Sequence, residues 1–257
     1  MKKYIKIVLF ILFFIILVIM FGFLETKRFK IKEYNIIDKS LPSSFNGIKI
    51  VHFGDILYGT SINKNMLKKI INEINTLKPD IVIFTGDLYP EGIKLTKDNE
   101  KDIKNILGKI DASLYKYAIK GDNDTDNYNH IMSEAGFILL DNTKEKLYYK
   151  GNTPIIISNT TCEEDLFSIR LIHKPDDVDN LDFTNINLII AGHSLNGQIR
   201  IPFYGGAIKK EGSKKYLDEK YMVNNIPFYI TNGLGTNSFK FRLFNTPSFN
   251  LYRLTNY

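Results

Sequence analysis

Short apolar runs in this chain repeatedly end in a polar residue, and a glycine often stands directly before it. The polar residues concerned are Asp55, Asp87, Asp122, Asp124, His173 and His193, with glycines at positions 54, 86, 121 and 192. A single aspartate after a strand is usually a turn former or a helix cap. The ordered recurrence instead predicts one ligand site at the carboxyl ends of several strands, where glycine permits a sharp turn and close backbone approach.

Strands and helices alternate in the first half of the soluble part. Residues 48–53, 80–87 and 114–124 are predicted strands, and residues 62–78, 98–110 and 127–137 have the apolar spacing of amphipathic helices. Most of the later apolar runs are predicted strands: 137–140, 145–149, 154–158, 167–172, 187–191, 227–231, 239–244 and 249–254. This order predicts an α/β (α+β) fold with one sheet, or two stacked sheets, flanked by helices.

The N-terminus carries an apolar run, Ile7 to Leu24, with no charged residue in 18 positions. As a helix it is ~27 Å long, close to the ~30 Å hydrocarbon core of a bilayer. No small-residue cleavage site follows, so residues 1–24 are expected to be an uncleaved transmembrane signal anchor, with a cleaved signal peptide as the alternative. Residues 25–45 are expected to be a juxtamembrane linker, and residues 46–257 the soluble domain.

The net charge and the cysteine content say little about the binding partners of this protein or its cellular compartment. The net charge is +6, but the lysines are spread along the chain, so specific nucleic-acid binding is not expected. Lysines flank the apolar run on both sides, and the positive-inside rule does not decide orientation. A long folded domain after an N-terminal anchor favours a single-pass cell-membrane protein with its domain outside the cytoplasm. The single cysteine, Cys162, excludes a disulfide within the chain.

The ordered polar residues resemble the motifs of the calcineurin-like metallophosphoesterases, in particular a bacterial membrane-associated branch. The family motifs run D-x-H, G-D, G-N-H-[DE], a separate His, and G-H-x-H. The segments "PDIVIFTGDLYP" and "AGHSLNGQIRIPFYGG" are similar to the second and last of these, and the resemblance covers roughly residues 46–257. It implies a four-layer sandwich, with two stacked mixed β-sheets flanked by helices, and hydrolysis of a phosphomonoester or phosphodiester by a metal-activated water.

The resemblance implies one complete metal site. Asp87 stands at the position that bridges two ions in the family, and Asp122, His173 and His193 stand at the other ligand positions of one ion. Asp122 replaces an asparagine, but a carboxylate oxygen is also a suitable ligand. Two carboxylates and two imidazoles suit Mn, Fe or Zn. We therefore expect one firmly bound divalent ion.

The second metal site that the resemblance implies is degenerate in this sequence. The segment "GDIL" keeps Asp55 but has Leu57 in place of a histidine, and "GHSL" has Leu195 in place of the last histidine. Leucine has no lone pair to donate, so only Asp55 and Asp87 remain there. A second ion is expected to be weak or absent.

The catalytic motif is altered as well. Asn123 stands where the family has the histidine proposed to protonate the leaving group, and Asp124 follows it as the acidic residue of that motif. An asparagine donates hydrogen bonds but delivers no proton near neutral pH. Two hypotheses follow: a membrane-anchored phosphoesterase of reduced activity on a lipid or cell-envelope phosphoester, or an inactive pseudoenzyme that binds a metal or phosphate ligand at the membrane surface. Aspartates and histidines that only cap and hydrogen-bond are the third alternative.

Overall fold

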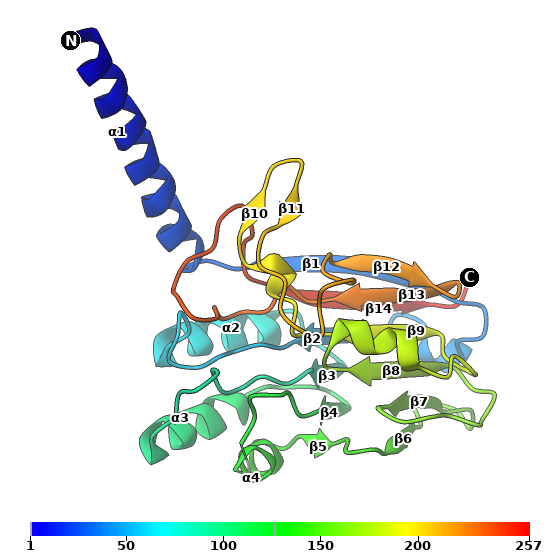
Figure 1. Ribbon diagram of the computed structural model, residues 1–257. Helices are drawn as coiled ribbons and strands as arrows, with labels where there is room; N and C mark the ends of the chain where they lie inside the picture. The colour runs from blue at the N-terminus through cyan, green and yellow to red at the C-terminus, as the bar shows by residue number, and fades with distance from the viewer. Residues whose placement is uncertain (1, 126) are drawn as a thin grey trace.

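The apolar runs assemble into two six-stranded β-sheets that stack face to face in the computed structural model, which describes residues 2–125 and 127–257 (Figure 1). The first sheet has the spatial order β1 (Lys30–Ile37), β14 (Ser248–Thr255), β2 (Lys49–Phe53), β3 (Ile81–Phe84), β4 (Tyr115–Ala118), β5 (Ile138–Leu139). The second has the order β12 (Lys220–Val223), β13 (Ile226–Ile230), β9 (Leu188–Ala191), β8 (Ser168–Ile172), β7 (Ile155–Ser158), β6 (Lys144–Leu147).

Both sheets are mixed, which confirms the expected pair of stacked mixed sheets. Strands β2 to β5 are parallel, and β14 pairs antiparallel with β2. In the second sheet β13, β9, β8 and β7 are parallel, and β12 and β6 pair antiparallel at the two edges. Because the carboxyl ends of parallel strands lie at one edge of a sheet, the loops that follow them gather there.

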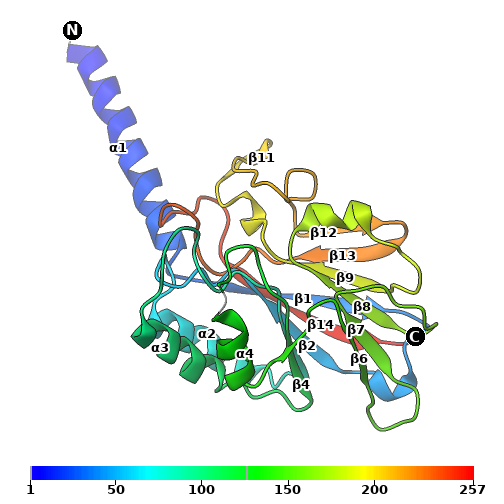
Figure 2. The same cartoon turned by 60° about the horizontal axis from the view of Figure 1, so that its bottom comes forward.

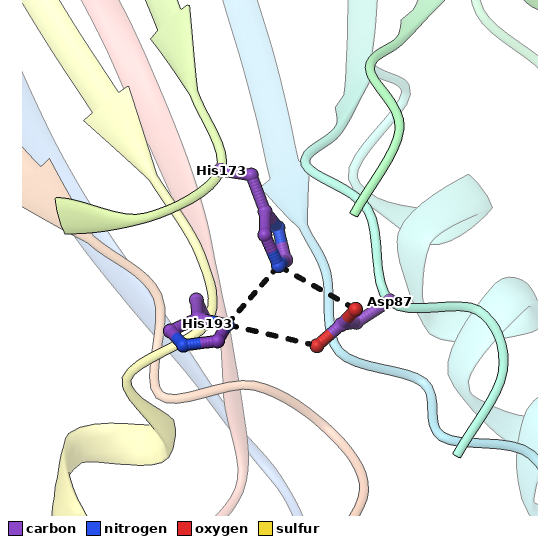
Figure 3. Close-up of side chains that lie close together, drawn as sticks. All are labelled: Asp87, His173 and His193. Atoms are coloured by element: carbon purple, nitrogen blue, oxygen red, sulfur yellow. Dashed lines mark hydrogen bonds and ion pairs between the residues drawn. The ribbon is translucent and has the colours of Figure 1, made fainter. Parts of the chain in front are cut away.

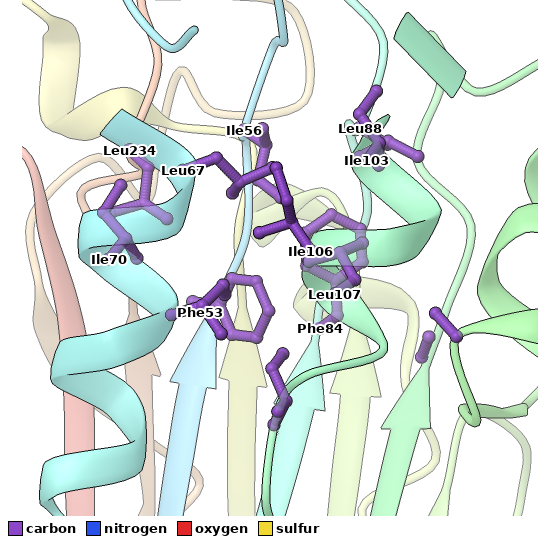
Figure 4. Close-up of a cluster of buried hydrophobic side chains, with 14 of the residues drawn as sticks. Phe53, Ile56, Leu67, Ile70, Phe84, Leu88, Ile103, Ile106, Leu107 and Leu234 are labelled. Carbon is purple, nitrogen blue, oxygen red and sulfur yellow. The ribbon is translucent and has the colours of Figure 1, made fainter. Parts of the chain in front are cut away.

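Helices cover the outer face of the first sheet. These are α2 (Lys64–Thr76), α3 (Lys97–Leu107) and α4 (Tyr128–Glu134). Leu67 and Ile70 of α2 and Ile106 of α3 pack with Phe53 and Phe84 of the sheet (Figure 4). Strands covered on both faces bury every residue, which is why β3 reads as a continuous apolar run rather than an alternating one.

A second core lies between the sheets, and a third lies on the outer face of the second sheet. Ile50, Ile83, Ile169 and Ile190 belong to the core between the sheets. The outermost face is covered by a 3₁₀ helix, η2 (Pro175–Asn180), and by loops rather than by an α-helix; Val178 of η2 packs there. A third, two-stranded sheet is the hairpin formed by β10 (Arg200–Ile201) and β11 (Gly205–Gly206).

The apolar N-terminus forms one helix, α1 (Lys2–Glu25), which extends away from the domain in both ribbon views (Figures 1 and 2). The most apolar 18-residue window of its segment Lys3–Glu25 has a mean hydropathy of 3.4, and only 6% of that window is buried. By length and composition it is able to cross a membrane. The expected transmembrane segment, residues 1–24, therefore corresponds to a helix, apart from Met1, which lies outside the described residues.

Two segments differ from expectation. Residues 25–45, expected to be a linker, contain β1, which pairs in parallel with β14 along its whole length. Because β1 is an edge strand in which only Ile36 is buried, its sequence KIKEYNII lacks the apolar run of a central strand. Residues 239–244, expected to be a strand, form an irregular segment with an isolated bridge between Leu243 and Ile199.

Candidate metal centre

Three buried ligand groups meet where the two sheets face each other. Asp87 follows β3 of the first sheet, whereas His173 and His193 follow β8 and β9 of the second (Figure 3). One ligand atom from each residue lies within 4.8 Å of the others, and all three side chains are buried. Stacking of the sheets, rather than any local sequence spacing, therefore creates the cluster.

Backbone carbonyls orient both imidazole rings. Nδ1 of His173 donates to the carbonyl oxygen of Thr85 at 2.6 Å, and Nε2 of His193 donates to that of Glu211 at 2.7 Å. The other ring nitrogens, His173 Nε2 and His193 Nδ1, lie 3.1 Å apart and are 3.4 and 3.8 Å from the two carboxylate oxygens of Asp87. A histidine whose second nitrogen is held by a carbonyl is the usual arrangement of a metal-binding histidine, so the donor set fits a divalent ion.

The charges of the cluster depend on each other. Burial opposes ionisation of Asp87, yet hydrogen bonds from His173 and His193 hold its pKa well below the ordinary value. Burial would likewise lower the pKa of His173, but its hydrogen bond to Asp87 raises it to about 9. Since a metal needs an unprotonated imidazole, metal binding would displace a proton from this pair.

Asp55 lies beside the cluster and holds the backbone of His193. It is buried, and both carboxylate oxygens accept the His193 N–H at 3.0 Å. Burial and the neighbouring charge of Asp87 raise the pKa of Asp55 to about 6. With no imidazole at positions 57 and 195, the Asp55–Asp87 pair is a poor site for an N-preferring ion.

The two leucines of the degenerate site retain the backbone conformation of their surroundings. Leu57 and Leu195 are buried and have φ angles of 45° and 48°, in the left-handed region that bulky residues rarely adopt. Asp55, Asp87 and His193 have similar angles of 51°, 59° and 66°. Leu57 and Leu195 therefore share the left-handed backbone of Asp55, Asp87 and His193, while their side chains supply no ligand atom.

Asp122 lies outside the cluster, contrary to the sequence-based expectation. Its side chain is 45% exposed, and its carboxylate pairs with the Lys174 ammonium at 2.7 Å. The next residue points inward instead: Asn123 donates to Asp87 from its backbone N–H at 3.1 Å and from Nδ2 at 3.0 Å. Adjacent side chains in this tight turn face different directions, so only one of the two faces Asp87.

Asp124 positions the loops and does not reach the cluster's ligand atoms. Its buried carboxylate accepts backbone N–H groups from Gly121 at 2.8 Å, Asp87 at 3.0 Å, Leu88 at 2.8 Å and Tyr89 at 3.3 Å. Burial raises its pKa to about 6. Four backbone donors occupy its oxygens, so Asp124 holds the loops around Asp87 in this structure, and its catalytic role stays a prediction.

Two cations that the motifs do not include lie at the centre. Nζ of Lys210 is 4.0 Å from Asp87 Oδ2, and its side chain is 15% exposed. Arg242 is fully buried and donates to the carbonyl oxygens of Asn232, Gly233 and Gly235 at 2.6–3.2 Å. Burial lowers the pKa of Arg242 to about 9, and the charge of Asp55 partly opposes this shift. Neither residue follows a strand or has a characteristic spacing that would have marked it in the sequence.

The remaining two histidines serve other purposes. His52 is buried and lies 3.0 Å from the Tyr252 hydroxyl and from Oγ1 of Thr85, and burial lowers its pKa to about 3. His130 is exposed on α4 beside Glu134. Neither ring belongs to the Asp87–His173–His193 cluster.

Comparison with known proteins identifies the family to which this chain belongs. A family model described as calcineurin-like phosphoesterase matches residues 48–197, which is more than half of the chain. The chain belongs to the calcineurin-like phosphoesterase family. Members of this family are divalent-metal-dependent hydrolases, and the Asp87–His173–His193 cluster is one possible metal site of this member.

Several relatives are known as metallophosphoesterases. An uncharacterized metallophosphoesterase of Bacillus subtilis, YkuE, is 28% identical over 90% of this chain and 87% of its own length. The UDP-2,3-diacylglucosamine pyrophosphatase LpxG of Chlamydia muridarum is 30% identical over 36% of this chain and 28% of its own. Among solved structures, GAP50, the anchor in the inner membrane complex of Plasmodium, covers 80% of both chains with a TM-score of 0.46 and 13% identity.

Proposed function

We propose that this calcineurin-like protein is a membrane-anchored phosphoesterase that works with one firmly bound divalent ion, Mn, Fe or Zn. The observation that carries the proposal is the buried Asp87–His173–His193 cluster, whose two imidazoles are oriented by backbone carbonyls. Groups that are desolvated, charged and convergent are costly to maintain without a function. The donor set suits an N-preferring ion better than Mg or Ca.

A divalent ion held there would lower the pKa of a water and stabilise charge on a phosphoryl oxygen. The protein residues keep the ligands in place. Asn123 fixes the Asp87 carboxylate through two hydrogen bonds, and Asp55 fixes the backbone of His193. Because the ligands are already held in position, the site needs little rearrangement of its side chains during the reaction.

We propose that Lys210 supplies part of the positive charge that the family obtains from a second ion. Its ammonium lies beside the bridging carboxylate, on a side chain that is mostly shielded from solvent. Arg242 adds a second fixed charge near Asp55. A cation in a low-dielectric site stabilises a phosphoryl group far more strongly than it does in water.

Asn123 restricts the substrates that fit this site. Because no imidazole stands at this position to protonate a leaving group, an alkoxide would have to leave unprotonated, at a cost of about 10²–10⁴ in rate. Phosphoanhydrides and aryl phosphoesters release more stable anions, so we expect them to be the better substrates. The pyrophosphatase relative LpxG is in keeping with a lipid or cell-envelope substrate of this kind. We place α1 in the cell membrane as a single span with the domain outside the cytoplasm.

The test uses the full chain in detergent with added Mn and a chromogenic aryl phosphodiester. We expect wild-type turnover, a loss of about 10²-fold or more in His193→Ala, and no loss in His130→Ala. The two variants remove the same side chain, once from the cluster and once from an exposed helix. Equal activity in both variants would contradict the proposal.

A specific observation favours a second candidate function, a pseudoenzyme that binds a metal or phosphate ligand at the membrane surface. Leu57, Leu195 and Asn123 together remove two metal ligands and the acid of the family motifs. Metal bound at the cluster, with no turnover of any anhydride or ester tested, would support this second function instead.

Restoring the two histidines should restore the second metal. The backbone at Leu57 and Leu195 already has the left-handed conformation found at Asp55, Asp87 and His193. In Leu57→His/Leu195→His we expect the bound Mn or Zn to rise from about one to about two equivalents per chain, because imidazole is a preferred ligand of both metals. Elemental analysis after gel filtration measures the ratio. A ratio unchanged in a folded double variant would show that the site has lost more than its ligands.

A further inference from the structure

An exposed apolar patch lies on the same side of the domain as the transmembrane helix. The hairpin β10–β11 extends in the same general direction as α1 in both ribbon views (Figures 1 and 2). Its tip and a neighbouring loop residue line one surface cavity, and we call these residues the hairpin patch: Ile201, Pro202, Phe203, Tyr204 and Phe244. Phe203 is fully exposed and Tyr204 is 74% exposed, which is unusual for rings at the end of a soluble loop.

The end of α1 is fixed to the segment that carries Phe244. The rings of Phe21 and Phe244 lie 5.9 Å apart, and those of Phe23 and Phe241 lie 5.7 Å apart. The backbone N–H of Arg242 also donates to the carbonyl oxygen of Gly22 at 3.1 Å. The patch is therefore continuous with the last turns of the apolar helix.

The base of the hairpin is fixed to that same segment. Nε2 of Gln198 lies within 3.1–3.2 Å of the carbonyl oxygens of Asn237, Phe239 and Phe241. Oε1 of Gln198 accepts the Asn237 N–H at 2.7 Å. The position of the hairpin thus follows the position of α1, since both are held by residues 237–244.

We propose that the hairpin patch inserts into the lipid interface beside α1 and forms a second membrane contact. Aromatic rings with a polar edge, such as Tyr204, are favoured at the level of the headgroups. Lys27 and Lys240 line a neighbouring cavity together with Phe23, and these cations suit anionic headgroups. The occupant of the patch is a bilayer that contains anionic lipid.

The contact would fix the metal centre relative to the membrane. The hairpin follows His193 through the short 3₁₀ helix η3 (Leu195–Gly197). A domain held at two places, α1 and the hairpin patch, has little freedom to tilt on a single helix. The metal centre would then keep one distance and orientation with respect to the lipid surface.

The chain contains no tryptophan, so a single introduced tryptophan reports its own surroundings. The full chain is reconstituted in nanodiscs of phosphatidylcholine and phosphatidylglycerol whose acyl chains carry bromine, a contact quencher. The variants are Phe203→Trp in the patch, Phe14→Trp within α1 and Tyr148→Trp, an exposed site after β6. All three positions are exposed, so the replacements disturb no packing of the domain.

We expect the emission of Phe203→Trp to fall by about half relative to unbrominated lipid, as for an interfacial ring that meets lipid on one side. Phe14→Trp should be quenched more, and Tyr148→Trp should be unchanged. Emission of Phe203→Trp that matches Tyr148→Trp overturns the proposal, whatever Phe14→Trp shows, and a patch that binds another protein instead gives this same result. The measurement is independent of activity, so it holds or fails separately from the proposed function.

Discussion

Asp87→Ala is expected to abolish metal binding and to lower kcat/KM for an aryl phosphodiester by about 10³-fold, equivalent to ~4 kcal/mol of transition-state stabilisation. Asp87 contributes the carboxylate of the buried cluster and faces both imidazoles. Its removal takes away the carboxylate that both imidazoles face, and two imidazoles alone hold a divalent ion weakly. Elemental analysis and steady-state kinetics on the full chain measure the two effects.

Asp122→Ala is the matched control for this variant. The family resemblance implies that Asp122 is a metal ligand like Asp87, whereas the structure places its carboxylate at the surface beside Lys174. We therefore expect Asp122→Ala to keep its metal and most of its activity. Metal loss in both variants would mean that the turn carrying Asp122 rearranges when the ion binds, and the four-ligand set implied by the resemblance would then be restored.

Lys210→Met is expected to lower kcat/KM by about 10²-fold, ~3 kcal/mol, while the metal content stays unchanged. Methionine has a similar length but no charge, so the variant removes the ammonium beside Asp87 and little volume. The loss should be mainly in kcat, because a fixed cation acts most strongly on the charge that develops in the transition state.

Lys209→Met separates this local effect from a change in net charge. Lys209 is the preceding residue and is exposed to solvent. Both variants lower the net charge by one, but only Lys210 lies near the cluster. Equal kinetics for the two variants would contradict the role of Lys210, and loss of metal in Lys210→Met would assign that residue to holding the site together instead.

The edge of the sheets that carries the cluster was predictable from local sequence. Asp87 and His193 each follow an apolar run and a glycine, and His173 directly follows one. A strand with both faces covered must be apolar throughout, and its first polar residue marks the exit from the core. The resemblance to the calcineurin-like family was visible for the same reason, since its motifs lie at these exits.

Apolar patterning does not predict the type of an element whose burial differs from that of a central strand or an amphipathic helix. Strand β1 is an edge strand in which Ile36 alone is buried, so its sequence has the polarity of a linker. Residues 239–244 have the apolar content of a strand, but their aromatic rings pack against α1 rather than in a sheet. The spacing of apolar residues predicts which side chains are buried, but it does not predict which element they pack against.

The sequence by itself determined the apolar helix, the presence of sheet flanked by helices and three of the residues that meet at the metal centre, because burial imposes a local pattern on each. The choice of two stacked sheets over one came from the family resemblance. Only the tertiary structure decided that Asn123 rather than Asp122 faces Asp87, since the direction of a side chain in a turn depends on its φ and ψ angles. It also decided that Lys210 and Arg242, from distant loops, lie beside the buried carboxylates. Charges that meet across two sheets have no fixed sequence spacing, so packing alone brings them together.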